Sequence, residues 1–229
     1  MKVIFCGYRS WALNIIHEIK KHEKISSCEI ISSKDNYDSK FNQLVSRADL
    51  IVFLGWSWII PNEITNNHLC IGIHPSDLPY YRGGSPLQHQ IINGVIKTKV
   101  SLMTISEKLD GGDIWLKHDL DLGGSTNETI LKNLEKSTLA LLNNFFNDFP
   151  HIDPVKQDLT KGSYFKRRTI DQSRLDLKDF KTKSLEEIYN FIRCLTDPYP
   201  NAFIEDKNGN KLLFKEVQFV PSDKEIRKE

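Results

Sequence analysis

The sequence has few cysteines, no long hydrophobic run and almost no net charge, and each scarcity narrows the possible functions. Cys6, Cys28, Cys70 and Cys194 are scattered among 229 residues without a C-x-x-C pair, so we interpret them as reduced cysteines and predict no metal site. No apolar run approaches the roughly 18 to 20 residues that span a bilayer, and no signal peptide precedes the first predicted strand. We therefore expect a cytoplasmic protein with no membrane partner.

The balance of charges argues against a polyanionic partner. The 31 basic and 30 acidic side chains leave a formal charge of +1, and nucleic-acid-binding domains usually carry a clear basic excess. We therefore predict no nucleic-acid partner.

The first half of the chain is predicted to be a doubly wound, Rossmann-like α/β domain. Apolar runs at 3–6, 28–31, 50–54 and 69–73 are typical of buried strands. Alternating strands and helices are typical of a parallel sheet with helices on both faces. The first turn holds one glycine, Gly7, so it lacks the G-x-G-x-x-G fingerprint of dinucleotide binding.

The predicted domain covers residues 1–155, and a small α+β region follows at 156–229. Strands are expected at 100–106 and 113–120, and a capping box at 125–128 should start the last helix of the domain.

In the C-terminal region, a second capping box at 184–187 should start an amphipathic helix that Pro198 ends. The segment 207–210, Lys-Asn-Gly-Asn, predicts a hairpin. The apolar stripe of the helix consists of Ile188, Phe191, Ile192 and Leu195.

Two segments carry candidate chemistry. Residues 74–86 read H-P-S-D-L-P-Y-Y-R-G-G-S-P directly after the strand at 69–73, and residues 109–114 read L-D-G-G-D-I. Proline and glycine force the first segment into a loop, and ligands of open α/β sheets bind outside the carboxyl ends of the strands. His74 is therefore expected at the functional edge of the sheet.

These segments resemble the formyltransferases that use N10-formyltetrahydrofolate, whose signature joins an H-P-S-x-L-P-x-Y-R-G loop to a D-x-G-x-I loop. The resemblance implies that His74 and Asp110 are catalytic and that N10-formyltetrahydrofolate donates the formyl group. Imidazole titrates near neutrality and can donate to a developing oxyanion. The family usually has an asparagine two residues before the histidine, where this chain has Gly72. A backbone N–H, a water or Gln88 are the candidates to replace it.

The resemblance also implies two sets of binding residues. Residues predicted to bind the folate are Gly55, Trp56, Ser57, Trp58, Ile59, Lys108, Leu109 and Asp110. Residues predicted to bind the acceptor substrate are Arg9, Ser76, Asp77, Tyr81, Arg82, Gly83, Gly84, Arg167 and Tyr199. Arginines suit a pyrophosphate because they bind it bidentately.

The acceptor is inferred from the C-terminal region. Residues 193–203, R-C-L-T-D-P-Y-P-N-A-F, resemble formyltransferases that act on sugar nucleotides. This implies a nucleotide-linked amino-deoxysugar, such as dTDP-4-amino-4,6-dideoxyglucose or its 3-amino analogue, destined for a surface polysaccharide. The alternatives are glycinamide ribonucleotide, an aminoacyl-tRNA, or a non-catalytic folate- or nucleotide-binding relative. A homodimer is also expected, with the apolar stripe at its interface.

Overall fold

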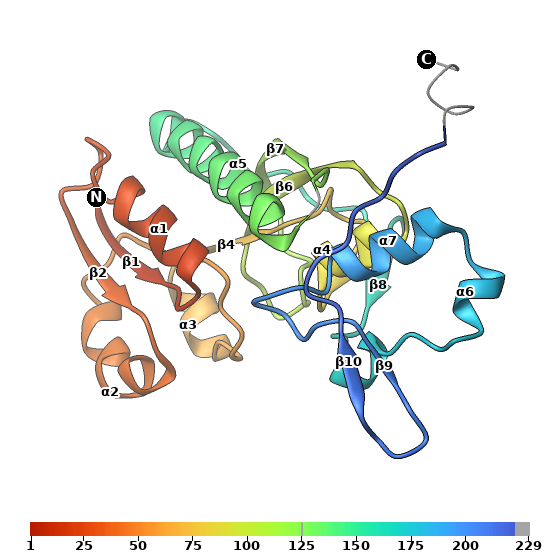
Figure 1. The fold of residues 1–229 in the computed structure, drawn as a ribbon. Helices are drawn as coiled ribbons and strands as arrows, with labels where there is room; N and C mark the ends of the chain where they lie inside the picture. Colours follow the sequence, from red (N-terminus) through yellow and green to blue (C-terminus); the bar gives the residue numbers. More distant parts are fainter. Residues whose placement is uncertain (125, 223–229) are drawn as a thin grey trace.

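The computed structural model describes residues 1–124 and 126–222, and a six-stranded sheet forms its centre (Figure 1). The strands of this sheet are β1 (Lys2–Cys6), β2 (Ser27–Ile31), β3 (Leu50–Phe53), β4 (Cys70–His74), β6 (Lys97–Thr104) and β7 (Ile114–Asp121). Their order is β2-β1-β3-β4-β6-β7. The first four are parallel, whereas β6 runs antiparallel to both β4 and β7. The carboxyl ends of β1, β3 and β4 therefore share one edge.

Helices cover both faces of this sheet, which confirms the doubly wound α/β prediction. The helices are α1 (Ser10–Ile19), α2 (Lys34–Val45), α3 (Asn62–Asn67), α4 (Pro86–Ile92), α5 (Asn127–Asp148), α6 (Asp179–Thr182) and α7 (Leu185–Arg193). Along β1, Val3 and Phe5 join one apolar cluster while Ile4 and Cys6 join another, because successive side chains of a strand point to opposite faces. Helices α1 and α5 pack on the first face, and α2 and α3 pack on the second.

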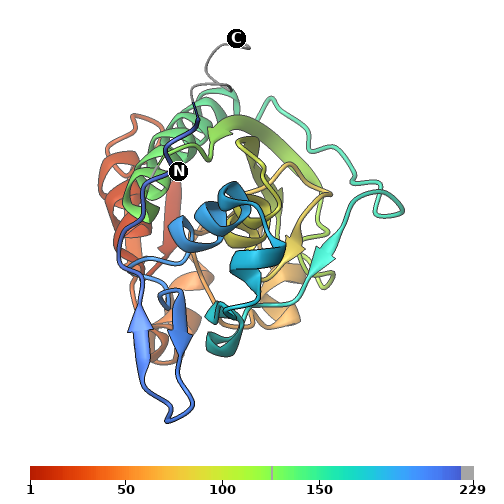
Figure 2. The ribbon, with the colours of Figure 1, turned by 45° about the vertical axis from the view of Figure 1, so that its right-hand side comes forward.

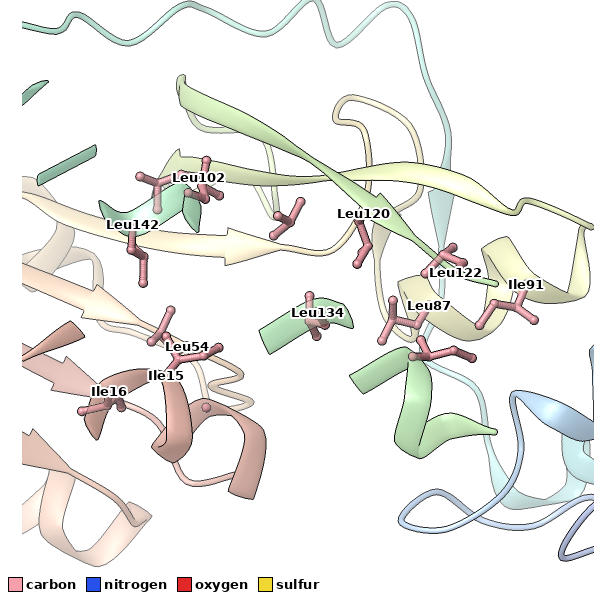
Figure 3. Close-up of a cluster of buried hydrophobic side chains, with 14 of the residues drawn as sticks. Ile15, Ile16, Leu54, Leu87, Ile91, Leu102, Leu120, Leu122, Leu134 and Leu142 are labelled. Atoms are coloured by element: carbon pink, nitrogen blue, oxygen red, sulfur yellow. The ribbon is translucent and has the colours of Figure 1, made fainter. Parts of the chain in front are cut away.

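The larger apolar cluster joins residues of the sheet to residues of α1, α4 and α5 (Figure 3), and it extends into the C-terminal region. It includes Ile188, Phe191 and Ile192 of α7, together with Leu195. The predicted stripe is therefore buried inside its own chain and provides no dimer surface, so the homodimer stays a prediction. The division at 155/156 also stays a prediction, although one continuous core spans it.

Several predicted boundaries need correction. His74 is the last residue of β4, where it pairs with Ser101, and does not follow the strand. Helix α7 ends at Arg193, before Pro198, so Leu195 lies beyond it.

Both predicted capping boxes can be compared with the helix starts. The Ser184 box is confirmed: Ser184 and Glu187 exchange both side-chain-to-backbone bonds. The other was placed too early, because the Thr126 side chain caps α5 and accepts from the Thr129 N–H. Ser125, the first residue of that predicted box, lies outside the described residues.

Two small strand pairs complete the fold. The predicted hairpin is confirmed as β9 (Phe203–Glu205) and β10 (Lys211–Leu213), which project from the body (Figure 2). Strand β5 (Arg82–Gly83) pairs with β8 (Tyr164–Phe165), and a 3-10 helix follows at Ile170–Ser173. The β5–β8 pair ties the segment after α5 to the loop after β4. In the described segments, no helix combines the length and apolar character needed to cross a membrane.

Candidate functional site

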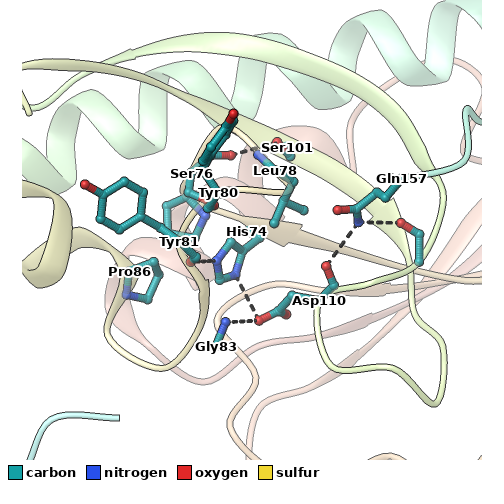
Figure 4. Close-up of polar contacts among 12 residues, drawn as sticks. His74, Ser76, Leu78, Tyr80, Tyr81, Gly83, Pro86, Ser101, Asp110 and Gln157 are labelled. Atoms are coloured by element: carbon teal, nitrogen blue, oxygen red, sulfur yellow. Dashed lines mark hydrogen bonds and ion pairs between the residues drawn. The ribbon is translucent and has the colours of Figure 1, made fainter. Parts of the chain in front are cut away.

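His74 and Asp110 lie side by side, although 36 positions of sequence separate 74 from 110 (Figure 4). The His74 Nδ1 atom is 3.6 Å from Asp110 Oδ2, and both side chains are largely buried. His74 projects from the end of β4, and Asp110 comes from the loop between β6 and β7. The structure therefore brings the two predicted catalytic residues together.

Two backbone groups orient this pair. His74 Nε2 lies 2.7 Å from the Tyr81 carbonyl oxygen, which only accepts, so Nε2 is assigned the ring proton. Asp110 Oδ2 accepts from the Gly83 N–H at 2.7 Å. The lone pair of Nδ1 then faces the carboxylate across a gap too long for a direct hydrogen bond. A donor nitrogen that lies beside the pair, with one N–H directed at each acceptor, fits this geometry.

The backbone of both loops adopts conformations that few residues tolerate. Tyr81 (φ +58°) and Asp110 (φ +50°) are left-handed, which costs a non-glycine residue about 1 kcal/mol or more. Gly83 and Gly84 pack so closely on the segment 165–167 that a Cβ on either would overlap its backbone. These glycines admit β8 and Arg167 next to the loop, and their contact with an acceptor stays a prediction.

The beginning of the His74 loop is held by internal polar contacts. The Ser76 hydroxyl donates to the Tyr80 carbonyl at 2.6 Å, and the side chain is fully buried. Asp77 forms an ion pair of 2.5 Å with Lys117 on β7. The Ser76 hydroxyl thus has a partner inside the loop, and its contact with the acceptor stays a prediction. Asp77 is half-buried and paired with Lys117, and its contact with the acceptor stays a prediction.

Arg82 begins β5, and Tyr81 directly precedes this strand. The Tyr81 ring stacks on Phe165 with centroids 5.2 Å apart, so it helps to attach β8 to the loop. Arg82 Nε is buried and has no hydrogen-bond partner within residues 1–124 and 126–222. Their contacts with an acceptor stay predictions.

The predicted folate loop, residues 55–59, follows β3 at the shared edge. Gly55 is left-handed (φ +61°), and a Cβ there would lie 2.7 Å from the Trp11 ring. Trp56 and Trp58 contact each other with centroids 4.6 Å apart. Ile59 is 94% exposed.

The loop that carries Asp110 adjoins this segment. Asn62, at the start of α3, donates to Glu107 at 3.1 Å. Leu109 is 61% exposed, and Lys108 is also exposed. Trp56 Nε1 is buried without a hydrogen-bond partner in the described part of the chain. The exposed apolar side chains of Ile59 and Leu109 fit a flat ring such as a pterin.

Arg9 and Arg167 lie around one hydroxyl-rich patch at this edge. Arg167 donates to Ser57 Oγ at 3.2 Å, and Tyr8 donates to the same oxygen at 2.9 Å. The Arg9 guanidinium lies 5.2 Å from the Tyr8 ring centroid. Among residues 1–124 and 126–222, neither arginine forms a salt bridge with a carboxylate.

Tyr199 joins this patch from the loop after α7. Burial raises the pKa of its phenol, whereas the Arg9 charge and the Gln88 side chain oppose the rise. Arg9, Arg167 and Tyr199, three predicted acceptor-binding residues, are thus brought together from three distant segments. Gln88 is buried, and its Nε2 has no partner in the described part of the chain.

Sequence reasoning missed Gln157, which donates to the backbone carbonyls of Asp110 and Gly112. It lies in an irregular segment without periodicity or motif, so no sequence signal marks it. A surface groove of about 480 Å³ lies elsewhere, between residues 174–177 and the β9–β10 hairpin, and no predicted site residue lines it.

Comparisons with known proteins identify the family of this chain. The sequence matches the Formyl transferase family over residues 3–143. A methionyl-tRNA formyltransferase from a Nitratiruptor species is 34% identical over 185 residues, which cover 80% of this chain and 58% of that protein. The chain therefore spans little more than half of this curated relative.

Two solved structures extend the comparison. A methionyl-tRNA formyltransferase from Clostridium thermocellum superposes with a TM-score of 0.77 at 33% identity, covering 93% of this chain and 97% of that chain. A sugar N-formyltransferase from a Shewanella species gives 0.76 at 19% identity, covering 96% and 99%; this likeness shows the fold alone. The fold and the matched sequence define an α/β formyltransferase domain. The chain belongs to the formyl transferase family.

Proposed function

We propose that this protein transfers the formyl group of N10-formyltetrahydrofolate to the primary amine of a nucleotide-linked amino-deoxysugar. The observation that carries formyl transfer is the His74–Asp110 pair, placed by the two signature loops at the carboxyl edge of a family-defining fold. The folate supplies an activated formyl carbon, and loop 55–59 together with residues 108–110 would hold it.

The residues of the site divide the proton handling between them. An amine attacks only when it is neutral, so the incoming ammonium group must first lose a proton. His74 Nδ1 and Asp110 Oδ2 face each other as two acceptors 3.6 Å apart, and an amine nitrogen beside the pair can direct one N–H to each. As the bond from the amine to the formyl carbon forms, His74 Nδ1 would take a proton from the amine, Asp110 would stabilise the charged ring, and the ring would donate to the negative charge on the formyl oxygen. When the bond from the formyl carbon to folate N10 breaks, that proton would pass to N10 and tetrahydrofolate would leave.

The acceptor class follows from the arginine patch. A nucleotide-linked sugar carries a pyrophosphate, and guanidinium groups without competing carboxylates suit such an anion. Arg9 and Arg167 supply these groups, and Tyr199 adds a phenol beside them. A sugar N-formyltransferase from a Shewanella species has the same fold, so the fold is compatible with this choice.

Methionyl-tRNA is the second candidate acceptor, and the 33–34% identity to two methionyl-tRNA formyltransferases favours it. A near-neutral charge of +1 opposes it, because tRNA binding draws on phosphate neutralisation by basic side chains.

Formylation assays with defined amines test the proposal. The purified protein is incubated with N10-formyltetrahydrofolate and, separately, dTDP-linked 3- and 4-amino sugars, glycinamide ribonucleotide and methionyl-tRNA. Mass spectrometry should find a formyl adduct on an amino sugar, with tetrahydrofolate released. Arg9→Ala and Arg167→Ala should raise the KM of the sugar nucleotide about tenfold or more, whereas Arg47→Ala, at the opposite edge of the sheet, should not. Formylation of methionyl-tRNA alone would contradict the acceptor.

A further inference from the structure

Gln157 fixes the turn that presents Asp110. Its side chain is only 7% exposed, and its Nε2 donates at 3.0 Å to the Asp110 carbonyl and at 2.6 Å to the Gly112 carbonyl (Figure 4). One amide group therefore binds both ends of the three-residue turn. Gln157 lies beyond residues 3–143, the segment matched to the family.

Two backbone hydrogen bonds also hold this turn, from the Gly111 N–H to the Lys108 carbonyl at 2.9 Å and from the Thr104 N–H to the Asp113 carbonyl at 2.8 Å. Asp110 is left-handed at φ +50°, a conformation that the surrounding structure must impose on a residue with a side chain. Leu109, its neighbour, is 61% exposed and contributes little packing. Gly112 is pressed against the Thr104 carbonyl, where a Cβ would overlap that oxygen. The polar contacts of the backbone therefore decide where the turn sits.

Gln157 is itself held in place. Its neighbour Val155 exchanges two backbone hydrogen bonds with Ile114, at 2.8 and 2.7 Å. Ile114 begins β7, the strand that leads away from the Asp110 turn. The segment that carries Gln157 is thus anchored to the same sheet that carries His74.

We infer that Gln157 is a positioning residue: it holds the Asp110 backbone so that the carboxylate faces His74 Nδ1 and the Gly83 N–H. The glutamine amide carries two N–H groups and so satisfies two carbonyls at once without adding charge, which glutamate cannot do. Gln157 acts through Asp110 and leaves the reacting groups untouched.

Amide hydrogen exchange tests this inference without any assay of activity. The Gly83 N–H donates to Asp110 Oδ2 at 2.7 Å, so its exchange rate reports whether the carboxylate is in place. Gln157→Met keeps the length and removes both donors. Gln157→Asn keeps an amide but is one methylene shorter, and it serves if the first variant fails to fold. We expect exchange at Gly83 to accelerate about tenfold or more in either variant.

Asn127→Leu is the matched control. Asn127 is also a buried amide that donates to two backbone carbonyls, those of Cys194 and Thr196. The Asn127→Leu variant should leave the Gly83 exchange rate within about twofold of wild type. An unchanged Gly83 rate in a folded Gln157 variant, or an equal acceleration in Asn127→Leu, would overturn the inference.

Kinetics add a second readout, which rests on the proposed formyl transfer. Gln157→Met should lower kcat about 10- to 100-fold, the effect of a small misplacement of a reacting group, with each KM changed less than about threefold. In an Asp110→Asn background the same change should cause no further loss, because both substitutions affect one contact. Fully additive losses would contradict a role through Asp110. A wild-type protein that transfers no formyl group would count against the proposed function only, since Gly83 exchange would still decide the positioning role.

Discussion

Ile105 fills the space beside Gly72 that a larger residue there would need. A Cβ on Gly72 would lie 2.6 Å from Ile105 Cδ1 and 3.4 Å from the Phe53 carbonyl oxygen. Gly72 and His74 project from the same face of β4, because side chains alternate along a strand. The chain has therefore exchanged a polar side chain near the histidine for an apolar one from the next loop.

Restoring asparagine at position 72 is expected to be harmful. Gly72→Asn forces its Cβ onto Ile105, and overpacking of this kind costs about 1 to 3 kcal/mol of the free energy of unfolding. Ile105→Val removes the Cδ1 atom, so the double variant Gly72→Asn/Ile105→Val should recover most of the loss. Urea unfolding of wild type, the two single variants and the double variant measures the change in the free energy of unfolding. Equal losses in the single and double variants would show that Ile105 is not the obstacle.

The β5–β8 contact is tested by two glycines of similar conformation. Gly83 (φ +96°) and Gly94 (φ +76°) are both left-handed, but a Cβ on Gly83 would overlap the Phe165 backbone, whereas nothing lies within 4 Å of one on Gly94. Gly83→Ala should therefore lower both stability and turnover, and Gly94→Ala should show only the backbone strain of about 1 kcal/mol. Similar thermal unfolding temperatures for the two variants would contradict the close packing of β5 on β8.

Three of the four cysteines should be unreactive in the folded protein. Burial raises the pKa of Cys70 and of Cys194 to about 12, and that of Cys6 well above its usual value. Because the thiolate is the reacting form, iodoacetamide at pH 8 should modify the half-buried Cys28 first. Mass spectrometry after peptide digestion gives the order. Early modification of Cys70 would contradict its burial on β4.

His89 should make stability depend on pH. Burial lowers the pKa of its imidazole from the ordinary 6.5, and its ring stacks on Phe165. As the pH falls below 6.5, the unfolded chain takes up a proton at His89 that the folded chain binds less readily, so the free energy of unfolding decreases until the folded pKa is passed. His89→Phe keeps a stacking ring and should flatten the decline between pH 7 and 5. An unchanged slope in urea unfolding would contradict this linkage.

The proximity of His74 and Asp110 was predictable because the signature consists of two short, contiguous motifs. His74 and Asp110 each lie in a short motif, and the strand before each motif is marked by an apolar run. Gln157 was not predictable, because its two bonds go to backbone carbonyls that any sequence supplies. The inward hydrogen bond of the Ser76 hydroxyl to the Tyr80 carbonyl was likewise not visible in the motif. Helix α2 was overlooked although Tyr37, Phe41 and Val45 recur every four residues, a spacing typical of a half-buried helix.

The direction of β6 also lay beyond the sequence. Its apolar pattern indicates a strand but carries no information on the direction of pairing, and here it runs antiparallel to β4. Because Ser101 pairs with His74 and Thr104 with Ile71, β6 ends beside the start of β4, and the loop that follows must fold back to bring Asp110 to His74.

The central claim, formyl transfer by His74, is tested most directly by turnover of N10-formyltetrahydrofolate with a dTDP-linked amino sugar. Wild type should release tetrahydrofolate and formylated sugar in equal amounts, and a folded His74→Ala variant should turn over about 10² to 10⁴ times more slowly, the range for a positioned acid–base group. Near wild-type turnover in folded His74→Ala would contradict the account.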